Sequence, residues 1–180
     1  ILNISNYIGQ YQPEKANRIL LMAHWDTRQV ADYDPDPEKK DLPIPGANDG
    51  ASGVAVLLEL ARLLSDNQPA LGIDIVLFDA EDYGCPEHLD IEWTADSWCL
   101  GSQYWSNNPH VKDYYARYGI LLDMVGGKNA IFTQEEVSVY YAQSVIDNVW
   151  QVARDLGYSS RFTREKTPQI VDDHRYVNEI

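Results

Sequence analysis

Apolar and polar positions alternate in blocks along the chain, and their spacing predicts an alternation of strands and helices. Short apolar runs at 18–23, 72–80 and 118–126 predict buried strands. Longer stretches at 49–66 and 137–158 repeat apolar residues every three or four positions, which predicts helices. Such an alternation of strands and helices is typical of an α/β domain with a largely parallel sheet.

The apolar faces of the two long helices are expected to pack against this sheet. In the first helix that face consists of Val54, Leu57, Leu58, Ala61 and Leu64. In the second helix it consists of Val145, Val149, Trp150 and Ala153. A third helix is expected to begin near residue 100, and the charged, proline-rich stretch 27–48 reads as a long loop of the kind that usually carries function.

The length of 180 residues predicts a single domain over residues 1–180. A net charge of -14 argues against nucleic acid and against an anionic membrane as partners. No apolar run reaches the roughly 18 residues that a transmembrane segment needs. We recognise no signal peptide either, so a targeting segment is expected to be absent from this chain.

The two cysteines, Cys85 and Cys99, are too few for a disulfide scaffold and are not spaced as in a zinc knuckle. In an oxidising compartment they would form one bridge, and otherwise both would be free thiols. The sequence leaves both alternatives open.

Acidic residues and a histidine recur where the predicted strands end. His24 and Asp26 follow the first strand, Glu81 and Asp82 the second, and Asp123 lies near the end of the third. Ligands of open α/β sheets bind at that edge. Carboxylates gathered there repel one another unless a cation or shared protons hold them, and histidine combined with carboxylates favours zinc over calcium or magnesium.

Several of these residues have a non-catalytic alternative. An aspartate before a helix is a common N-cap, so either Asn48 or Asp49 is a natural cap for the helix that follows. An adjacent pair such as Glu81 and Asp82 is often solvated loop charge. A carboxylate inside an apolar run, as at Asp123, is harder to explain without a partner, because its burial is costly. The remaining histidines of polar loops, His88 and His110, are expected at the surface.

Taken together, several motifs resemble those of the zinc-dependent M28 peptidase clan, and most of all its bacterial glutaminyl cyclase branch. The resemblance covers residues 18–180 and rests on the order of "AHWDTR", "PGANDGASGVAVLLELARLL", "LFDAEDYG", "DSWCLGS", "LLDMVGG" and "VDDH". It implies a three-layer αβα fold around a mixed, largely parallel sheet, as in zinc aminopeptidases. It also implies that the C-terminal part of that fold is missing from residues 1–180.

The resemblance also implies roles for individual residues. Asp49 and Asp82 would be ligands of one zinc ion, and Glu81 would be the general acid/base. Glutaminyl cyclases more often carry glutamate at the position of Asp82, and the shorter side chain needs a closer backbone. The third zinc ligand, a histidine, is expected beyond Ile180. A second zinc, if bound, would use His24.

Further roles follow from the same resemblance. Asp123 and Asp172 match two aspartates that hydrogen-bond beside the active site and help to move the proton. Trp93 matches a tryptophan that lines the substrate pocket, whereas Trp98 is expected to pack in the core. His174 resembles a structural histidine of the "DDH" loop and is not expected to bind zinc.

Three functions therefore remain in view. The first is the zinc-dependent cyclisation of the N-terminal glutamine of peptides and proteins to pyroglutamate, with release of ammonia. The second is a two-zinc aminopeptidase, in which His24 and Asp123 would complete the second metal site and Asp49 would be shared. The third is a non-catalytic binding module. The surroundings of the site favour the cyclase, and analogy with exported relatives implies a periplasmic or secreted protein, with or without a lipid anchor.

Overall fold

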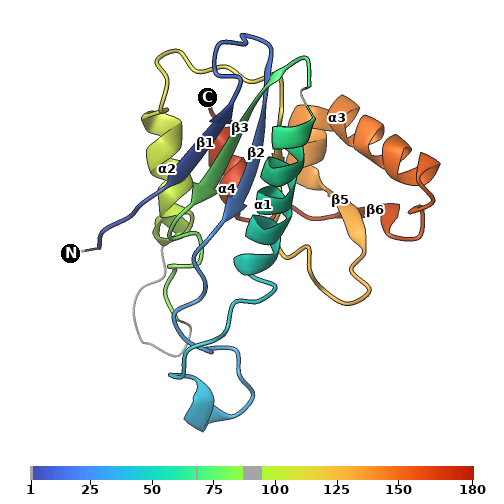
Figure 1. Cartoon of the computed structure of the whole chain (residues 1–180). Coiled ribbons are helices and arrows are strands. Elements are labelled where there is room, and N and C mark those ends of the chain that lie inside the picture. Colours follow the sequence, from blue (N-terminus) through green and yellow to red (C-terminus); the bar gives the residue numbers. More distant parts are fainter. Residues whose placement is uncertain (1, 68, 87–94) are drawn as a thin grey trace.

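The structure is a computed structural model that describes residues 2–67, 69–86 and 95–180 (Figure 1). Its strands are β1 (Tyr7–Tyr11), β2 (Arg18–His24), β3 (Gly72–Phe78), β4 (Gly119–Leu121), β5 (Phe132–Glu135) and β6 (Phe162–Thr167). Its helices are α1 (Ala51–Asp66), α2 (Leu100–Asn107), α3 (Glu136–Asp155) and α4 (Asp173–Val177), with 3-10 turns at Pro37–Lys39 and Ala95–Ser97. Within the described residues, no helix is long and apolar enough to cross a membrane.

The central sheet has the strand order β1-β3-β2-β4. Strand β2 is parallel to both β3 and β4, while the edge strand β1 is antiparallel to β3. The prediction of a mixed, largely parallel sheet is therefore confirmed. The sequence analysis missed β1, because an exposed edge strand carries no continuous apolar run.

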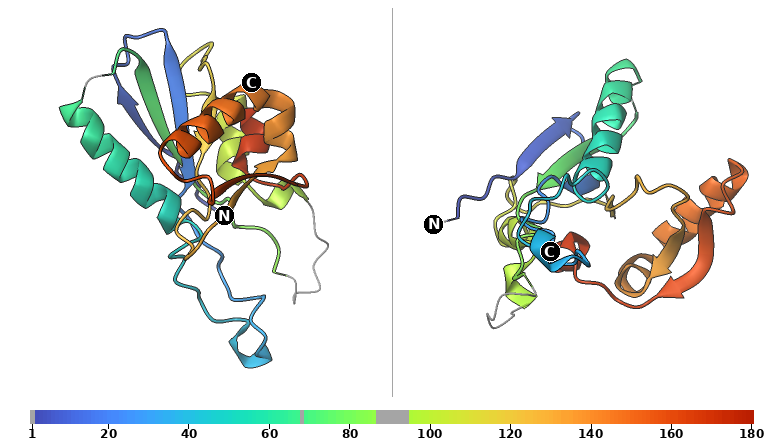
Figure 2. Two further views of the ribbon diagram at one scale, coloured as in Figure 1. Left: turned by 90° about the vertical axis from the view of Figure 1, so that its right-hand side faces the viewer. Right: turned by 90° about the horizontal axis from the view of Figure 1, so that it is seen from below.

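Helices cover both faces of this sheet, as the two views of Figure 2 show, with α1 on one face and α2 and α4 on the other. Successive side chains of β2 point to opposite faces and both sets are buried, which explains its unbroken apolar run. One core cluster contains Leu20, Met22, Val76, Phe78 and Trp105. The other contains Leu21, Ala23, Leu57 and Ile73. This arrangement confirms the three-layer αβα fold.

Helix α1 is rotated relative to its predicted orientation. Leu58 is 62% exposed and Ala61 is also exposed, so both were wrongly assigned to the inner face. A Cβ atom on Gly53 would lie 2.0 Å from the Leu122 carbonyl oxygen, which means that the helix touches the sheet at this glycine. The contact line consequently runs through Gly53 and Leu57 on to Leu60 and Leu64, because the smallest residue permits the closest approach.

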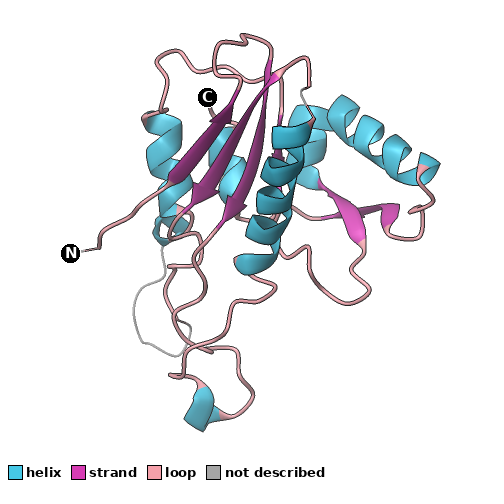
Figure 3. Cartoon of the chain, in the orientation of Figure 1, coloured by secondary structure: helices cyan, strands magenta, loops and turns pink. Residues whose placement is uncertain are grey.

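Strands β5 and β6 form a separate parallel pair, and helix α3 packs against it beside the main sheet (Figure 3). Of the four residues predicted to face inward, Ala153 is buried and the other three are half-buried. Trp150 packs against Phe162 and donates its indole N–H to the Thr163 carbonyl at 2.6 Å. The two strands were not predicted because their polar residues leave no apolar run.

Candidate metal and catalytic site

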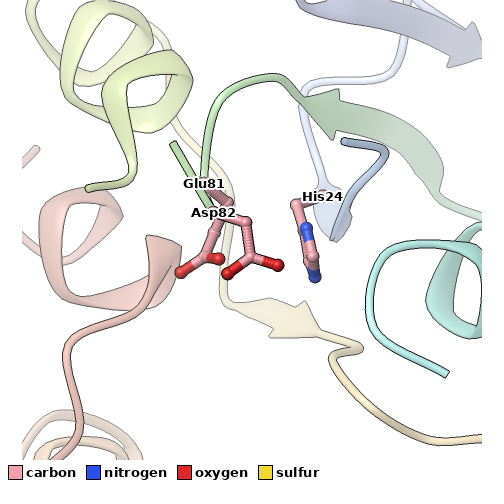
Figure 4. Close-up of side chains that lie close together, drawn as sticks. All are labelled: His24, Glu81 and Asp82. Carbon is pink, nitrogen blue, oxygen red and sulfur yellow. The ribbon is translucent and has the colours of Figure 1, made fainter. Parts of the chain in front are cut away.

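The side chains expected to form a site come together at the carboxyl edge of the central sheet. His24 is the last residue of β2 and pairs in register with Phe78, the last residue of β3. Glu81 and Asp82 follow in the turn after β3, and Figure 4 shows their carboxylates facing the same space as the His24 ring. The strand-end pattern therefore predicted a real cluster.

His24 lies at the centre of the cluster, with only 1% of its surface exposed. Its Nε2 atom lies 3.0 Å from Asp123 Oδ1 and 3.2 Å from Asp49 Oδ1, and its Nδ1 lies 3.5 Å from Asp26 Oδ1. Burial alone would lower the pKa of this ring, but the hydrogen bond with Asp123 and the close carboxylates of Asp26 and Asp49 raise it well above its usual value. Without a metal, the imidazolium balances part of the negative charge.

Asp49 does not cap helix α1, and Asn48 does not cap it either. The N-cap position is Gly50, where no side chain caps the helix. The Asp49 carboxylate points to His24, whose hydrogen bond lowers the pKa of this aspartate. The Asn48 side chain instead accepts a hydrogen bond from the Gly126 N–H at 2.9 Å. The N-cap prediction is wrong, because the tight approach of Gly50 to the Asp26 carbonyl sets the start of the helix.

Glu81 and Asp82 are not solvated loop charges, since they are 8% and 7% exposed. The Asp26 carboxylate accepts the backbone N–H groups of both residues, each at 3.0 Å. The Cys99 thiol contacts Glu81 Oε1 at 3.3 Å and donates to it. The Asp26 carboxylate thus holds the turn through its backbone N–H groups, while the side chains of Glu81 and Asp82 face the cluster.

Burial changes the proton affinity of both carboxyl groups in the metal-free protein. It raises the pKa of Glu81 to about 9, helped by the negative charges of Asp172 and Asp173. It raises the pKa of Asp82 to about 7, helped by the charge of Asp49. In the metal-free protein Glu81 therefore holds a proton at neutral pH, and the positive charge of a bound metal ion would favour its ionised form.

The start of α2 also forms hydrogen bonds with the turn that carries Glu81 and Asp82. The N–H groups of Cys99 and Leu100 donate to the carbonyls of Glu81 and Ala80, both at 3.0 Å. Ala80 and Cys99 both adopt left-handed backbone conformations, with φ of 56° and 55°. Such strain is uncommon away from glycine and gathers at functional sites, where surrounding contacts hold it in place.

The "DDH" stretch lies next to Glu81 at the start of α4. Asp172 caps this helix by accepting the N–H of Asp173 at 2.6 Å. Asp173 is fully buried, neither of its carboxylate oxygens has a hydrogen-bonding partner among the described residues, and burial raises its pKa to about 8. His174 Nε2 lies 3.2 Å from Glu135 Oε2, a carboxylate that also caps α3. His174 Nδ1 also lies 3.7 Å from Asp172 Oδ2, so this histidine contacts the capping carboxylates of α3 and α4 and is in neither group of candidate metal ligands.

The remaining predictions concern a tryptophan, two histidines and the two cysteines. Trp93 and His88 lie outside the described residues. His110 was wrongly placed at the surface: it is half-buried, stacked on Trp105 and accepting the indole N–H at 3.2 Å. Cys85 and Cys99 are both free thiols, so the bridge is not formed.

The cluster fits a zinc ion. Its ligand atoms form two groups, His24–Glu81–Asp82 and His24–Asp49–Asp123, each within a span of 4.8 Å. Asp82 Oδ2 and His24 Nδ1 are buried and have no hydrogen-bonding partner among the described residues. Buried polar atoms without partners indicate a missing ligand, and this donor set suits zinc.

Comparison with known proteins places the chain in a family. Residues 6–179 match Peptidase family M28. The chain belongs to this family. It is similar to the structure of the Bacteroides thetaiotaomicron glutaminyl cyclase, with 52% sequence identity and a TM-score of 0.96, covering 99% of this chain and 61% of that one. The Zn-dependent exopeptidase from Parabacteroides distasonis is similar to the same degree, at 53% identity and a TM-score of 0.96, again covering 99% and 61%.

A third relative is more distant. The glutaminyl-peptide cyclotransferase of Bos taurus is 28% identical over 145 residues, which is 69% of this chain and 37% of that protein. The chain thus spans about three fifths of the length of the Bacteroides thetaiotaomicron and Parabacteroides distasonis proteins. These relatives carry different names: two are called a glutaminyl cyclase or cyclotransferase, and one is called a Zn-dependent exopeptidase.

Sequence reasoning missed three residues that lie beside the candidate ligands. Arg28 was not singled out in the charged stretch 27–48, although it belongs to the "AHWDTR" motif. Cys99 was considered only for a disulfide, and its thiol contact with Glu81 needed the tertiary structure. Asp173 was passed over beside Asp172, and only its complete burial distinguishes it.

Proposed function

We infer that this chain forms the zinc-binding catalytic part of a glutaminyl-peptide cyclotransferase. The enzyme would convert the N-terminal glutamine of peptides and proteins to pyroglutamate and release ammonia. The observation that carries the proposal is the Glu81 carboxyl group, which is buried beside a zinc-compatible cluster and has a raised pKa. Similarity to a glutaminyl cyclase at 52% identity supports it.

Asp49 and Asp82 would hold the ion, together with the histidine expected beyond Ile180. A bound zinc would supply a Lewis acid that polarises the γ-carbonyl of the substrate glutamine. His24 would remain beside the ion, hydrogen-bonded to Asp123. One metal is sufficient for this chemistry, because the nucleophile and the amide belong to the same residue and the enzyme mainly fixes their geometry.

Glu81 would carry the proton. The α-amine of the substrate forms a bond with its own γ-carbonyl carbon, and its proton passes to the Glu81 carboxylate. The same proton then moves to the γ-amide nitrogen as the carbon–nitrogen bond breaks, so that ammonia leaves and Glu81 is regenerated. A carboxyl group with a pKa above its usual range suits such a two-way transfer. The neighbouring carboxylates of Asp123 and Asp172 would assist it, and Trp93 would line the substrate pocket.

An M28 aminopeptidase is the second candidate. The His24–Asp49–Asp123 group offers a second set of ligand atoms, and the relative from Parabacteroides distasonis is named an exopeptidase. In that enzyme Glu81 would activate water instead of an amine. The two functions differ in metal content and in product, which makes them experimentally separable.

The test uses the complete protein. We expect one zinc per chain and release of ammonia from peptides with N-terminal glutamine. Two zincs and free amino acids from ordinary peptides would support the aminopeptidase, and a protein inert to both substrates would support the binding module. Glu81→Gln keeps the shape of the side chain and is expected to lower kcat by about 10²–10⁴-fold with zinc content unchanged. Glu59→Gln, on the exposed face of α1, is the matched control and should retain full activity.

Export to the periplasm or medium remains part of the proposal. Locating the complete protein by cell fractionation would test it.

A further inference from the structure

Residues 24–28, the "HWDTR" segment, contact both the backbone N–H and the backbone carbonyl of Asp82. The Asp26 carboxylate accepts the Asp82 N–H at 3.0 Å. The Arg28 guanidinium donates from Nη1 to the Asp82 carbonyl at 3.1 Å. The N–H and the carbonyl belong to the two peptide groups that flank the Asp82 Cα. Fixing both of them restrains the backbone torsions that aim this carboxylate.

Arg28 is itself firmly held. Its Nε and Nη2 atoms donate to the two oxygens of Asp32 at 3.2 and 2.6 Å, and the two side chains are 8% and 1% exposed. The guanidinium lies 4.4 Å from the centre of the Trp98 ring, and Nη2 also donates to the Cys85 carbonyl at 3.1 Å. A planar fork that is both stacked and bidentate is specific to arginine, because a lysine ammonium cannot reproduce it.

The turn packs tightly beneath this guanidinium. A Cβ atom on Gly84 would lie 2.3 Å from the Trp98 ring and 2.7 Å from Arg28 Nη1. The Gly84 N–H also donates to the Ser97 carbonyl at 3.1 Å. The turn therefore has little room to move while Arg28 and Trp98 stay in place.

We propose that Arg28 is a positioning residue of the metal site, which holds the Asp82 backbone where its short carboxylate can reach the ion. The hydrogen bonds of Arg28 end on Asp32 and on backbone carbonyls, so its effect on the ion passes through Asp82. An aspartate has one torsion and one methylene fewer than the glutamate expected here, so its oxygens follow the backbone more strictly. The inference rests on the proposed zinc site.

The test is the zinc affinity of Arg28→Lys in the complete protein, measured by competition with a chelator. Lysine keeps the positive charge near the ion, so the substitution changes geometry and not net charge. Zinc affinity is expected to fall by about 10–100-fold, the usual effect of losing a residue that orients a ligand. In the zinc-free protein, the Gly84 amide is expected to exchange its hydrogen faster than in the wild type. Asp32→Asn, which weakens the hold on Arg28, decides the matter if Arg28→Lys does not fold.

Two other arginines provide matched controls. Arg18 forms a second buried, bidentate pair, with Asp74, at the opposite end of β2. Arg18→Lys should lower stability and leave both zinc affinity and Gly84 exchange unchanged. Arg62 forms an exposed bidentate pair with Glu59, and Arg62→Lys should change none of these quantities.

A double-mutant cycle adds a readout that a purely structural role would not move. In an Asp82→Glu background the longer side chain can follow a displaced backbone, so Arg28→Lys should cost less zinc affinity than in the wild type. Equal zinc affinity in wild type, Arg28→Lys and Asp32→Asn would overturn the inference. A loss in Arg18→Lys as large as that in Arg28→Lys would overturn it as well. A wild type that binds no zinc would overturn the proposed function and this inference with it, and the wild-type titration identifies that case.

Discussion

Replacing Gly50 by alanine is expected to lower both the stability of the protein and its affinity for zinc. Gly50 follows Asp49 directly, and its φ of 90° and ψ of -64° lie outside the regions that L-residues readily adopt. A Cβ atom there would lie 2.1 Å from the Asp26 carbonyl oxygen, whereas an ordinary carbon–oxygen contact is about 3.3 Å. The backbone beside Asp49 must therefore shift by roughly 1 Å to admit alanine.

The expected cost of Gly50→Ala has two parts. The unfavourable backbone conformation costs about 1–3 kcal/mol. The forced displacement adds about 1–3 kcal/mol, as overpacking typically does. We therefore expect a loss of about 2–6 kcal/mol in the free energy of unfolding, measured by urea denaturation of the zinc-free protein. Zinc affinity should fall too, because Asp49 and the Asp26 backbone move apart.

Gly157 is the matched control. Its φ of 85° is nearly the same, but a Cβ atom there would meet nothing within 4 Å. Gly157→Ala should cost only the conformational part, about 1–2 kcal/mol, and leave zinc affinity unchanged. If the two variants agreed within about 0.5 kcal/mol and both bound zinc normally, the close approach at Gly50 would not constrain the site.

Two further predictions concern buried polar groups. Asp74 is fully buried, and although burial raises its pKa, hydrogen bonds from Arg18, Gln10 and Tyr114 lower it below the usual value. The resulting stabilisation is present above the unfolded pKa of about 3.9 and is lost as the pH falls through the folded pKa. Asp74→Asn should thus lower the free energy of unfolding by about 3–5 kcal/mol at pH 7, and by less than that near pH 3. An equal loss at both pH values would contradict the ion-pair explanation. Cys99 is fully buried and burial raises its pKa, whereas Cys85 is half-buried. A thiol reagent should therefore label Cys85 alone in the native protein and both cysteines in denaturant, as measured by peptide mass spectrometry. Absence of label on both cysteines in denaturant without reductant would show a bridge instead.

Several features could be predicted from local sequence because they depend on local patterns. The apolar run of β2 reflects burial on both of its faces, and the spacing of Val54 and Leu57 reflects the period of a helix. Residues at the ends of predicted strands, such as Glu81 and Asp123, could be expected to lie at one edge of the sheet, because parallel strands end at the same edge. Where the pattern was weak, as in β1 and β6, the strand was missed.

The sequence by itself determined the alternation of the central strands β2, β3 and β4 with helices, the sheet edge that carries the chemistry, and the donor set of His24 with its carboxylates. Only the tertiary structure decided which side chains actually meet. Burial and pairing depend on residues distant in the chain: the contact of Cys99 with Glu81, the hold of Arg28 on Asp82, and the role of Gly50, not Asp49, as helix cap. A local pattern carries the period of an element, but a close contact between two elements is set by packing, which no single segment contains.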